Sequence, residues 1–130
     1  MSVDVFFMRF VGQEVQPVPF NHVRTVLERF ASVTDDGIVT FDGEEVEQTS
    51  LEIDCTGMFQ QLLIPRCQLT PRFQECAYAL LNECGLCMFD ESLDAIYAVT
   101  NISDEIPTNL LDQMANGLVL VARPDQIGSG

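Results

Sequence analysis

Residues 3–10, Val-Asp-Val-Phe-Phe-Met-Arg-Phe, place the strongest constraint on the fold. They are rich in residues that favour β-strands, and neither of the two alternating faces is polar throughout. One face holds Val3, Val5, Phe7 and Arg9, and the other holds Asp4, Phe6, Met8 and Phe10. Since a strand that is apolar on both faces must be covered on both, the segment is predicted to be a central strand of a sheet.

A helix between Thr70 and Gly85 is the next clear element. Thr70 is a favourable N-cap, Pro71 suits the first helical position, and Gly85 suits the position after the last turn. Between them, apolar residues recur at helical spacing and form one face. This face comprises Phe73, Cys76, Ala77, Leu80, Leu81 and Cys84. The pattern predicts an amphipathic helix that packs on the core.

An earlier helix is expected over residues 21–32, with Asn21 as its N-cap. Its apolar stripe is Val23, Val26, Leu27, Phe30 and Ala31. Arg24 and Glu28 are four residues apart and are expected to pair on its surface. Residues 12–19 are expected to form a loop, because prolines interrupt regular structure there.

Asp42-Gly43 is a strong signal for a two-residue hairpin turn, because such a turn needs positive φ at both positions. It should join a strand at 37–41 to a returning strand at about 45–55, in which Leu51, Ile53 and Cys55 alternate with polar residues. Further strands are expected at residues 86–89, 95–99 and 118–122. One short helix is expected at residues 108–116, with Thr108 as its N-cap.

Met58–Cys67 fits a strand and a short helix equally well, and the choice stays open. The order is therefore β-α-β-β-(β)-α-β-β-α-β. This order predicts an α+β fold with a mostly antiparallel or mixed sheet of about five to six strands. Two main helices and one short helix should pack on one face. We expect a single domain over residues 1–126 and a flexible C-terminal tail over 127–130.

The charge of the chain limits its partners. Twenty acidic and six basic residues give a formal net charge of −14. Residues 35–54 hold eight acids and no base, and residues 75–112 also hold eight acids and no base. Because nucleic acids and anionic membranes attract clustered lysine and arginine, neither is expected as a partner. The basic residues are all arginines, which excludes lysine chemistry.

The cysteines do not predict redox chemistry. Five cysteines, an odd number, suggest reduced thiols in a cytoplasmic protein, and the first residues carry no basic region typical of a secretory signal. Cys84 and Cys87 have C-x-x-C spacing, but at the C-terminus of a helix, where the dipole does not lower a thiol pKa. With His22 as the single histidine, a four-ligand zinc site is not expected. The sequence predicts neither a catalytic residue, a metal nor a cofactor.

Carboxylates near the two predicted hairpins are the candidate binding residues. A calcium-loop pattern is absent, so two alternatives remain: a solvated surface, or a surface for a basic protein partner. The first hairpin would supply Glu44, Glu45, Glu47, Glu52 and Asp54. Asp90, Glu91 and Asp94 would join them if the two hairpins lie adjacent.

Two stretches resemble a group of small bacterial proteins, some of which are similar to immunity proteins of polymorphic toxin systems. The first is the opening Met-Ser-Val-Asp-Val-Phe-Phe-Met-Arg-Phe-Val-Gly-Gln-Glu, with the following proline and the Asn21 helix. The second runs from Ala98 to Asp112, Ala-Val-Thr-Asn-Ile-Ser-Asp-Glu-Ile-Pro-Thr-Asn-Leu-Leu-Asp. The resemblance implies a bacterial, cytoplasmic setting, and it carries over no active site or binding residue.

We therefore expect a non-enzymatic acidic binding protein, of the immunity type that neutralises a basic toxin. The alternative is a small acidic dimeric secretion chaperone, for which residues 58–64 would supply an apolar groove. A protein with no more than a solvated acidic surface is the third reading. Whether the chain forms a homodimer stays open.

Overall fold

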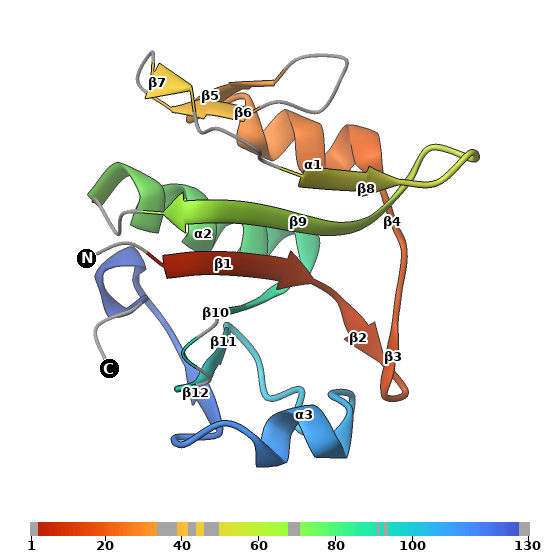
Figure 1. The fold of residues 1–130 in the computed structure, drawn as a ribbon, viewed down its shortest axis with the longest axis vertical. Coiled ribbons are helices and arrows are strands. Elements are labelled where there is room, and N and C mark those ends of the chain that lie inside the picture. Colours follow the sequence, from red (N-terminus) through yellow and green to blue (C-terminus); the bar gives the residue numbers. More distant parts are fainter. Residues whose placement is uncertain are drawn as a thin grey trace.

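The computed structural model describes residues 3–33, 39–41, 44–45, 50–67, 71–90, 92 and 94–127. Figure 1 shows a main sheet crossed by two longer helices, with smaller strands above and below. The helices are α1 (Phe20–Leu27), α2 (Pro71–Cys84) and α3 (Thr108–Asp112), with a 3-10 turn at Pro124–Gln126. The strands are β1 (Val3–Met8), β2 (Phe10–Val11), β3 (Glu14–Val15), β4 (Val18–Pro19), β5 (Ala31–Val33), β6 (Val39–Phe41), β7 (Glu44–Glu45), β8 (Ser50–Ile53), β9 (Met58–Cys67), β10 (Cys87–Asp90), β11 (Ile96–Ala98) and β12 (Leu118–Leu120).

The main sheet has seven strands, and its pairing confirms an α+β fold with a mixed sheet. The order β12-β11-β10-β1-β9 runs across the molecule, and β8 pairs with the far edge of β9. β4 pairs with the first residues of β9, on the edge that β1 occupies further along. Only the pair β11 and β12 is parallel among the described strands. β5, β6 and β7 form a separate three-stranded sheet.

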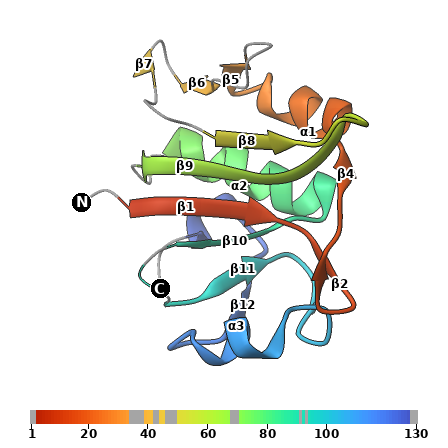
Figure 2. The same cartoon turned by 45° about the vertical axis from the view of Figure 1, so that its right-hand side comes forward.

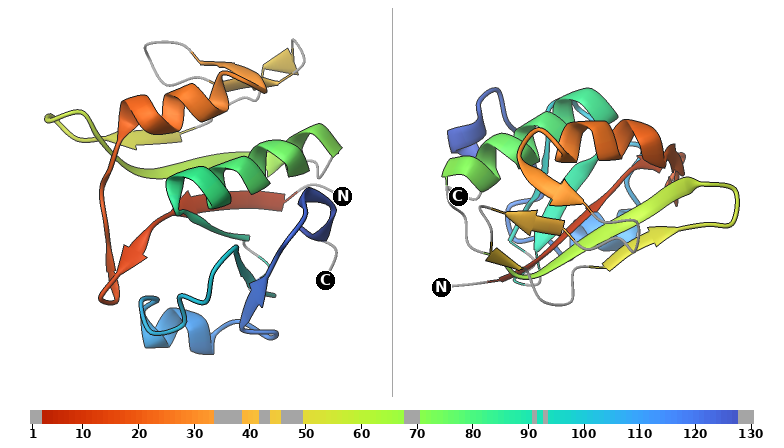
Figure 3. Two further views of the ribbon diagram at one scale, coloured as in Figure 1. Left: turned by 180° about the vertical axis from the view of Figure 1, so that it is seen from behind. Right: turned by 90° about the horizontal axis from the view of Figure 1, so that it is seen from above.

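β1 lies in the middle of the main sheet and is covered on both faces, as the sequence predicts. Val5 and Phe7 are buried in a first core with α1 and α2. The centroid of the Phe7 ring lies 6.3 Å from that of the Phe73 ring of α2. Phe6 and Met8 point to the other face and pack on a second core. Figure 3 shows α1 and α2 side by side on one side of the sheet. The alternation of side chains along β1 therefore separates two cores.

The short helix α3 lies on the opposite face from α1 and α2, so the expectation that all three helices share one face is wrong for α3. Leu110, Leu111 and Met114 belong to the second core, together with Phe6 and Met8. The reason is the preceding turn, which buries Ile106 in that same core. Thr108 is the first residue of the helix and does not cap it, because Pro107 occupies the cap position.

Met58–Cys67 is a strand, β9, which resolves the open choice between strand and helix. It lies between β1 and β8, and Phe59, Leu62 and Ile64 are buried in the first core. Pro65 is tolerated because the three residue steps from Ile64 to Cys67 of β9 oppose only two steps of β1, from Val5 to Val3, in a β-bulge. A proline has no N–H to donate, and a bulge is where a strand can omit that bond.

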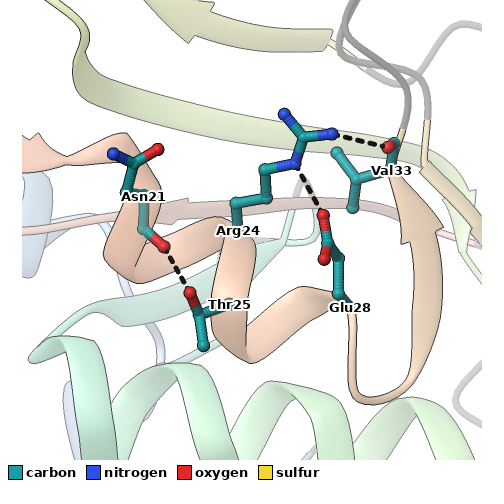
Figure 4. Close-up of polar contacts among 5 residues, drawn as sticks. All are labelled: Asn21, Arg24, Thr25, Glu28 and Val33. Carbon is teal, nitrogen blue, oxygen red and sulfur yellow. Dashed lines mark hydrogen bonds and ion pairs between the residues drawn. The ribbon is translucent and has the colours of Figure 1, made fainter.

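α1 begins one residue earlier and ends five residues earlier than the predicted helix. Pro19 occupies its N-cap position, and Asn21 lies inside the first turn, where its carbonyl accepts a bond from the Thr25 hydroxyl. The chain then turns into β5 at Ala31. Arg24 Nε pairs with Glu28 Oε1 at 2.6 Å, as predicted, and Arg24 Nη2 donates to the Val33 carbonyl of β5. Figure 4 shows how this arginine connects the helix to the strand that follows it.

α2 confirms the predicted second helix. Pro71 is its first residue, and all six residues of the predicted apolar face are buried. Gly85 follows the last turn with φ +69°, a backbone angle that glycine adopts without strain. The predicted N-cap, Thr70, lies outside the described residues.

The returning strand of the first hairpin is divided between two sheets. Phe41 pairs with Glu44, as a two-residue connection at positions 42 and 43 requires, although Asp42-Gly43 itself lies outside the described residues. β7 ends at Glu45 in the small sheet, whereas β8 belongs to the main sheet beside β9. A single strand over 45–55 is therefore wrong.

Residues 12–19 are not a loop throughout, because β2 and β3 form a hairpin around Gly12 and Gln13. Both turn residues have positive φ, +60° and +66°, which matches the right-handed twist of a two-residue hairpin. The Gln13 N–H donates to the Glu105 carbonyl at 2.8 Å, and Glu105 also accepts from the Gly12 N–H through its carboxylate.

The C-terminal boundary also differs from the expected one. Ile127 is 0% exposed in the first core, and its carbonyl accepts a bond from Gln74 Nε2 of α2. The expected tail over 127–130 therefore does not include Ile127, and residues 128–130 lie outside the described part.

Replacing Leu62 by alanine should lower the free energy of unfolding by about 2–5 kcal/mol. Leu62 is 0% exposed and lies on β9 between Phe7 of β1 and Leu51 of β8. The control is Leu120→Ala, because Leu120 is 52% exposed, and it should change stability by no more than about 0.5 kcal/mol. Urea unfolding measures both, and equal effects would contradict this account of the core.

Candidate functional site

The first block of acids, in residues 35–54, lies on and around β6, β7 and β8 in the described part of the chain. Glu44 and Glu45 are on β7, and Glu52 is on β8, where its side chain is exposed. Asp54 follows β8 directly and is exposed too. Glu47 lies outside the described residues. β7 and β8 both appear above β9 in Figure 1, with β7 near the end of β9 and β8 beside its first half, so the described members of this block lie on one side of β9.

Asp54 differs from the other acids because its carboxylate stabilises the turn between β8 and β9. Oδ1 accepts bonds from the Thr56 N–H (2.9 Å), the Thr56 hydroxyl (2.6 Å) and the Met58 N–H (3.0 Å). Oδ2 accepts a bond from Gln60 Nε2 at 3.2 Å. These donors, above all the Thr56 hydroxyl and then the Met58 N–H, hold the pKa of Asp54 below its ordinary value of 3.8.

The acids of the second hairpin also serve turns. Asp90 accepts bonds from the Ser92 N–H at 2.9 Å and from the Ser92 hydroxyl. Asp94 accepts a bond from Asn116 Nδ2 at 2.7 Å, and its carbonyl accepts the Asn116 N–H at the same distance. Glu91 lies outside the described residues. The carboxylates of Asp90 and Asp94 are thus half-buried acceptors within the fold.

The two predicted hairpins are not neighbours, so the condition for one combined acidic face is not met. β10, which ends at Asp90, is separated from β8 by β1 and β9. β10 and β8 are therefore three strand spacings apart, which is roughly 14 Å. Glu52 and Asp90 therefore belong to different parts of the surface, and the first block alone is the candidate site.

A short sequence signal identifies the turn-forming acids, and sequence reasoning missed it. An Asp or Asn followed two residues later by Ser or Thr occurs at Asp54-Cys-Thr56, Asp90-Glu-Ser92 and Asn101-Ile-Ser103. In each case the first side chain accepts the backbone N–H of the third residue, at 2.9, 2.9 and 3.1 Å. Such Asx turns are a known local preference of these residues.

Positive charge is concentrated on and around α1 and α2. Arg24 pairs with Glu28, and Arg29 pairs with Glu83 of α2. Arg72 of α2 donates through Nε to the Phe30 carbonyl at 3.0 Å. Residues 35–54 contain no base, so the arginines are separated from the densest acids along the sequence.

The C-x-x-C cysteines lie in different cores. Cys84 is buried in the first core and Cys87 in the second, on opposite faces of the sheet, and Cys87 Sγ donates to the Met8 carbonyl. Burial raises the pKa of Cys84 to about 11 and that of Cys87 to about 12. Burial likewise raises the pKa of Cys76 to about 12. These three thiols are structural, whereas Cys55 is exposed.

Within the described ranges, no three His, Cys, Asp or Glu side chains come together in a way that could hold a metal ion. No helix there is long and apolar enough to cross a membrane. Comparison of the chain with models of protein families, with curated proteins and with solved structures gives no match.

Replacing Thr56 by valine should raise the pKa of Asp54 toward 3.8, because the largest stabilising contact of the carboxylate is removed. In the unmodified protein a depressed folded pKa means that Asp54 stabilises the fold above pH 3.8 and loses this effect as the pH falls through the folded value. The NMR chemical shift of the Asp54 carboxyl carbon, recorded against pH, measures this pKa in the unmodified protein and in the Thr56→Val variant.

Thr25→Val is the matched control, because the Thr25 hydroxyl binds the Asn21 carbonyl and not Asp54. It should leave the Asp54 titration unchanged. An Asp54 that titrates at its ordinary value in the unmodified protein would show that these bonds do not hold the turn.

Iodoacetamide at mildly alkaline pH should modify Cys55 in the folded protein and react at least about tenfold more slowly with Cys76, Cys84 and Cys87. Mass spectrometry of digests locates the modified residues, and the denatured protein is the control in which all should react. A disulfide between Cys84 and Cys87 in the folded protein would contradict their placement on opposite faces.

Proposed function

We propose that this protein is a non-enzymatic binding protein that uses an acidic surface to bind a basic protein partner. The acidic surface consists of acids of the 35–54 block: Glu44 and Glu45 on β7, Glu52 on β8, and Glu47 between them in the sequence. The observation that carries the proposal is the charge of one continuous block. Residues 35–54 hold eight acids and no base, and its described strands β7 and β8 lie above β9 in Figure 1. The nearby Arg24 and Arg29 are already paired, with Glu28 and Glu83, so they do not neutralise this block.

A concentrated charge of one sign has a defined physical effect on association. It raises the rate at which an oppositely charged protein reaches the surface, and this effect weakens as salt screens the charges. It also disfavours acidic partners and nucleic acids. Glu52 is exposed and makes no ion pair in the described part of the chain, so its carboxylate is available for such an encounter.

The partner class we propose is a basic toxin, with this chain as the bacterial, cytoplasmic immunity protein that neutralises it. Residues 1–14 and 98–112 resemble a group of small bacterial proteins, some of which are similar to immunity proteins, and this resemblance supports the choice, as does the strong negative charge. The prediction is that an adjacent gene encodes a toxin domain with a basic surface.

Two alternatives are less well supported. A secretion chaperone would need an exposed apolar groove from residues 58–64, yet Phe59, Leu62 and Ile64 are buried in the first core. A solvated surface without a partner explains the acids that stabilise turns, such as Asp54 and Asp90. It gives no reason for a block of eight acids from which bases are excluded.

Reversing Glu45, Glu47 and Glu52 together to arginine should slow association with the toxin encoded by the adjacent gene by roughly tenfold or more at low salt. The dissociation rate should change less, because the main effect is on the encounter. Surface plasmon resonance at several salt concentrations separates the two rates.

The matched control reverses Glu75, Asp104 and Asp112, three exposed acids on other elements, and thus changes the net charge equally. It should retain most of the association rate. If both triple variants associate equally slowly, only the net charge matters. If neither is affected, the surface on β7 and β8 is not a binding site.

A further inference from the structure

The outer edge of β8 is open in the described part of the chain. β8 pairs with β9 on one side, and no described strand pairs with its other side. Figure 2 shows it at the upper margin of the main sheet. An open edge presents backbone N–H and C=O groups to which another extended chain can add as a strand.

The direction of the backbone groups on β8 follows from the residue after it. The Asp54 N–H donates to the Met58 carbonyl of β9 at 2.9 Å. The register shift between Glu52 and Ile53 has its extra residue, Gln60, on β9, so the peptide groups of β8 still point to alternate edges and the Glu52 N–H also faces β9. The N–H groups of Leu51 and Ile53 therefore face outward.

We propose that this outer edge of β8 receives an extended basic segment of the partner, which adds to the main sheet as a further strand. The proposal rests on the proposed function and names the place and the form of the contact. Backbone bonds to Leu51 and Ile53 would supply affinity, and the surrounding carboxylates would select arginine and lysine side chains.

The charge around β8 determines which occupant fits. Glu52 is exposed on the strand, and the edge lies within the block of eight acids, so it complements a basic chain. Ile53 is 36% exposed and offers an apolar contact for the stem of a long basic side chain. A second copy of this chain is disfavoured, because it would place two such acidic blocks against each other.

The other end of the sheet provides an internal comparison. β12 is also an edge strand, but residues 113–122 contain no charged residue. The Val121 N–H donates to the Ala98 carbonyl of β11 at 2.9 Å, so by the same alternation the Leu120 N–H faces outward. β12 therefore has an open edge without charge complementarity to a basic segment.

Ile53→Pro tests the edge directly. It removes one outward N–H and adds a ring that obstructs a new strand, whereas the bonds between β8 and β9 remain. Binding of a short synthetic peptide of alternating arginine and valine, followed by NMR, should weaken by roughly tenfold or more. Ile53→Ala, which keeps the N–H, and Leu120→Pro, which obstructs the other edge, should both bind like the unmodified protein. Thermal unfolding verifies that each variant is folded.

A peptide of the same sequence with N-methyl groups on alternate residues is the second control. It keeps the charge and loses the backbone donors, so it should bind weakly to every form.

If both peptides bind all variants alike, with strong salt dependence, charge alone attracts the segment. That result overturns the edge proposal, while the acidic binding surface stands. Loss of binding in Leu120→Pro but not in Ile53→Pro overturns it in favour of β12. No binding of either peptide at low salt also overturns it, and the charge-reversal variants then decide the proposed function separately.

Discussion

The structure depends on one constraint, the alternation of side chains along the central strands between two separate cores. Val5 and Phe7 point to the core beneath α1 and α2, and Phe6 and Met8 point to the core that α3 covers. A shift of one residue in β1 would exchange the two sets. Along β10 the same alternation places Cys87 in the second core, whereas Cys84 ends α2 in the first core, so the two thiols lie on opposite faces of the sheet.

The elements that the sequence predicted well are those determined by local pattern. α2 carries a strong helical periodicity with clear signals at its ends, and β1, β10 and β11 are short apolar runs rich in strand-forming residues. The errors occur where distant pairing decides. Nothing local separates β7 from β8, since that division depends on which strand each one meets. The apolar residues of Met58–Cys67 fit a strand and a short helical turn equally well, and the pairing of β9 with β1 and β8 decides between them.

The acids divide into two kinds that composition alone does not distinguish. Asp54, Asp90 and Glu105 accept backbone N–H groups and stabilise turns or a hairpin. Glu52 is exposed on an edge strand. The Asx pattern predicts the role of Asp54 and Asp90 from the sequence, but the strand order that puts β8 at an edge does not follow from any local signal. The net charge of −14 is therefore partly structural, and eight of the twenty acids belong to the block that contains the edge strand β8.

The central claim is that the acidic end of the sheet, with the open edge of β8, is a surface for a basic partner. Amide hydrogen exchange with and without that partner tests it most directly. The account predicts that the N–H groups of Leu51 and Ile53 exchange quickly in the free protein and become protected in the complex, while the N–H of Leu120 on β12 stays unchanged. Protection confined to β12 or to α1 and α2, with none on β8, would contradict it.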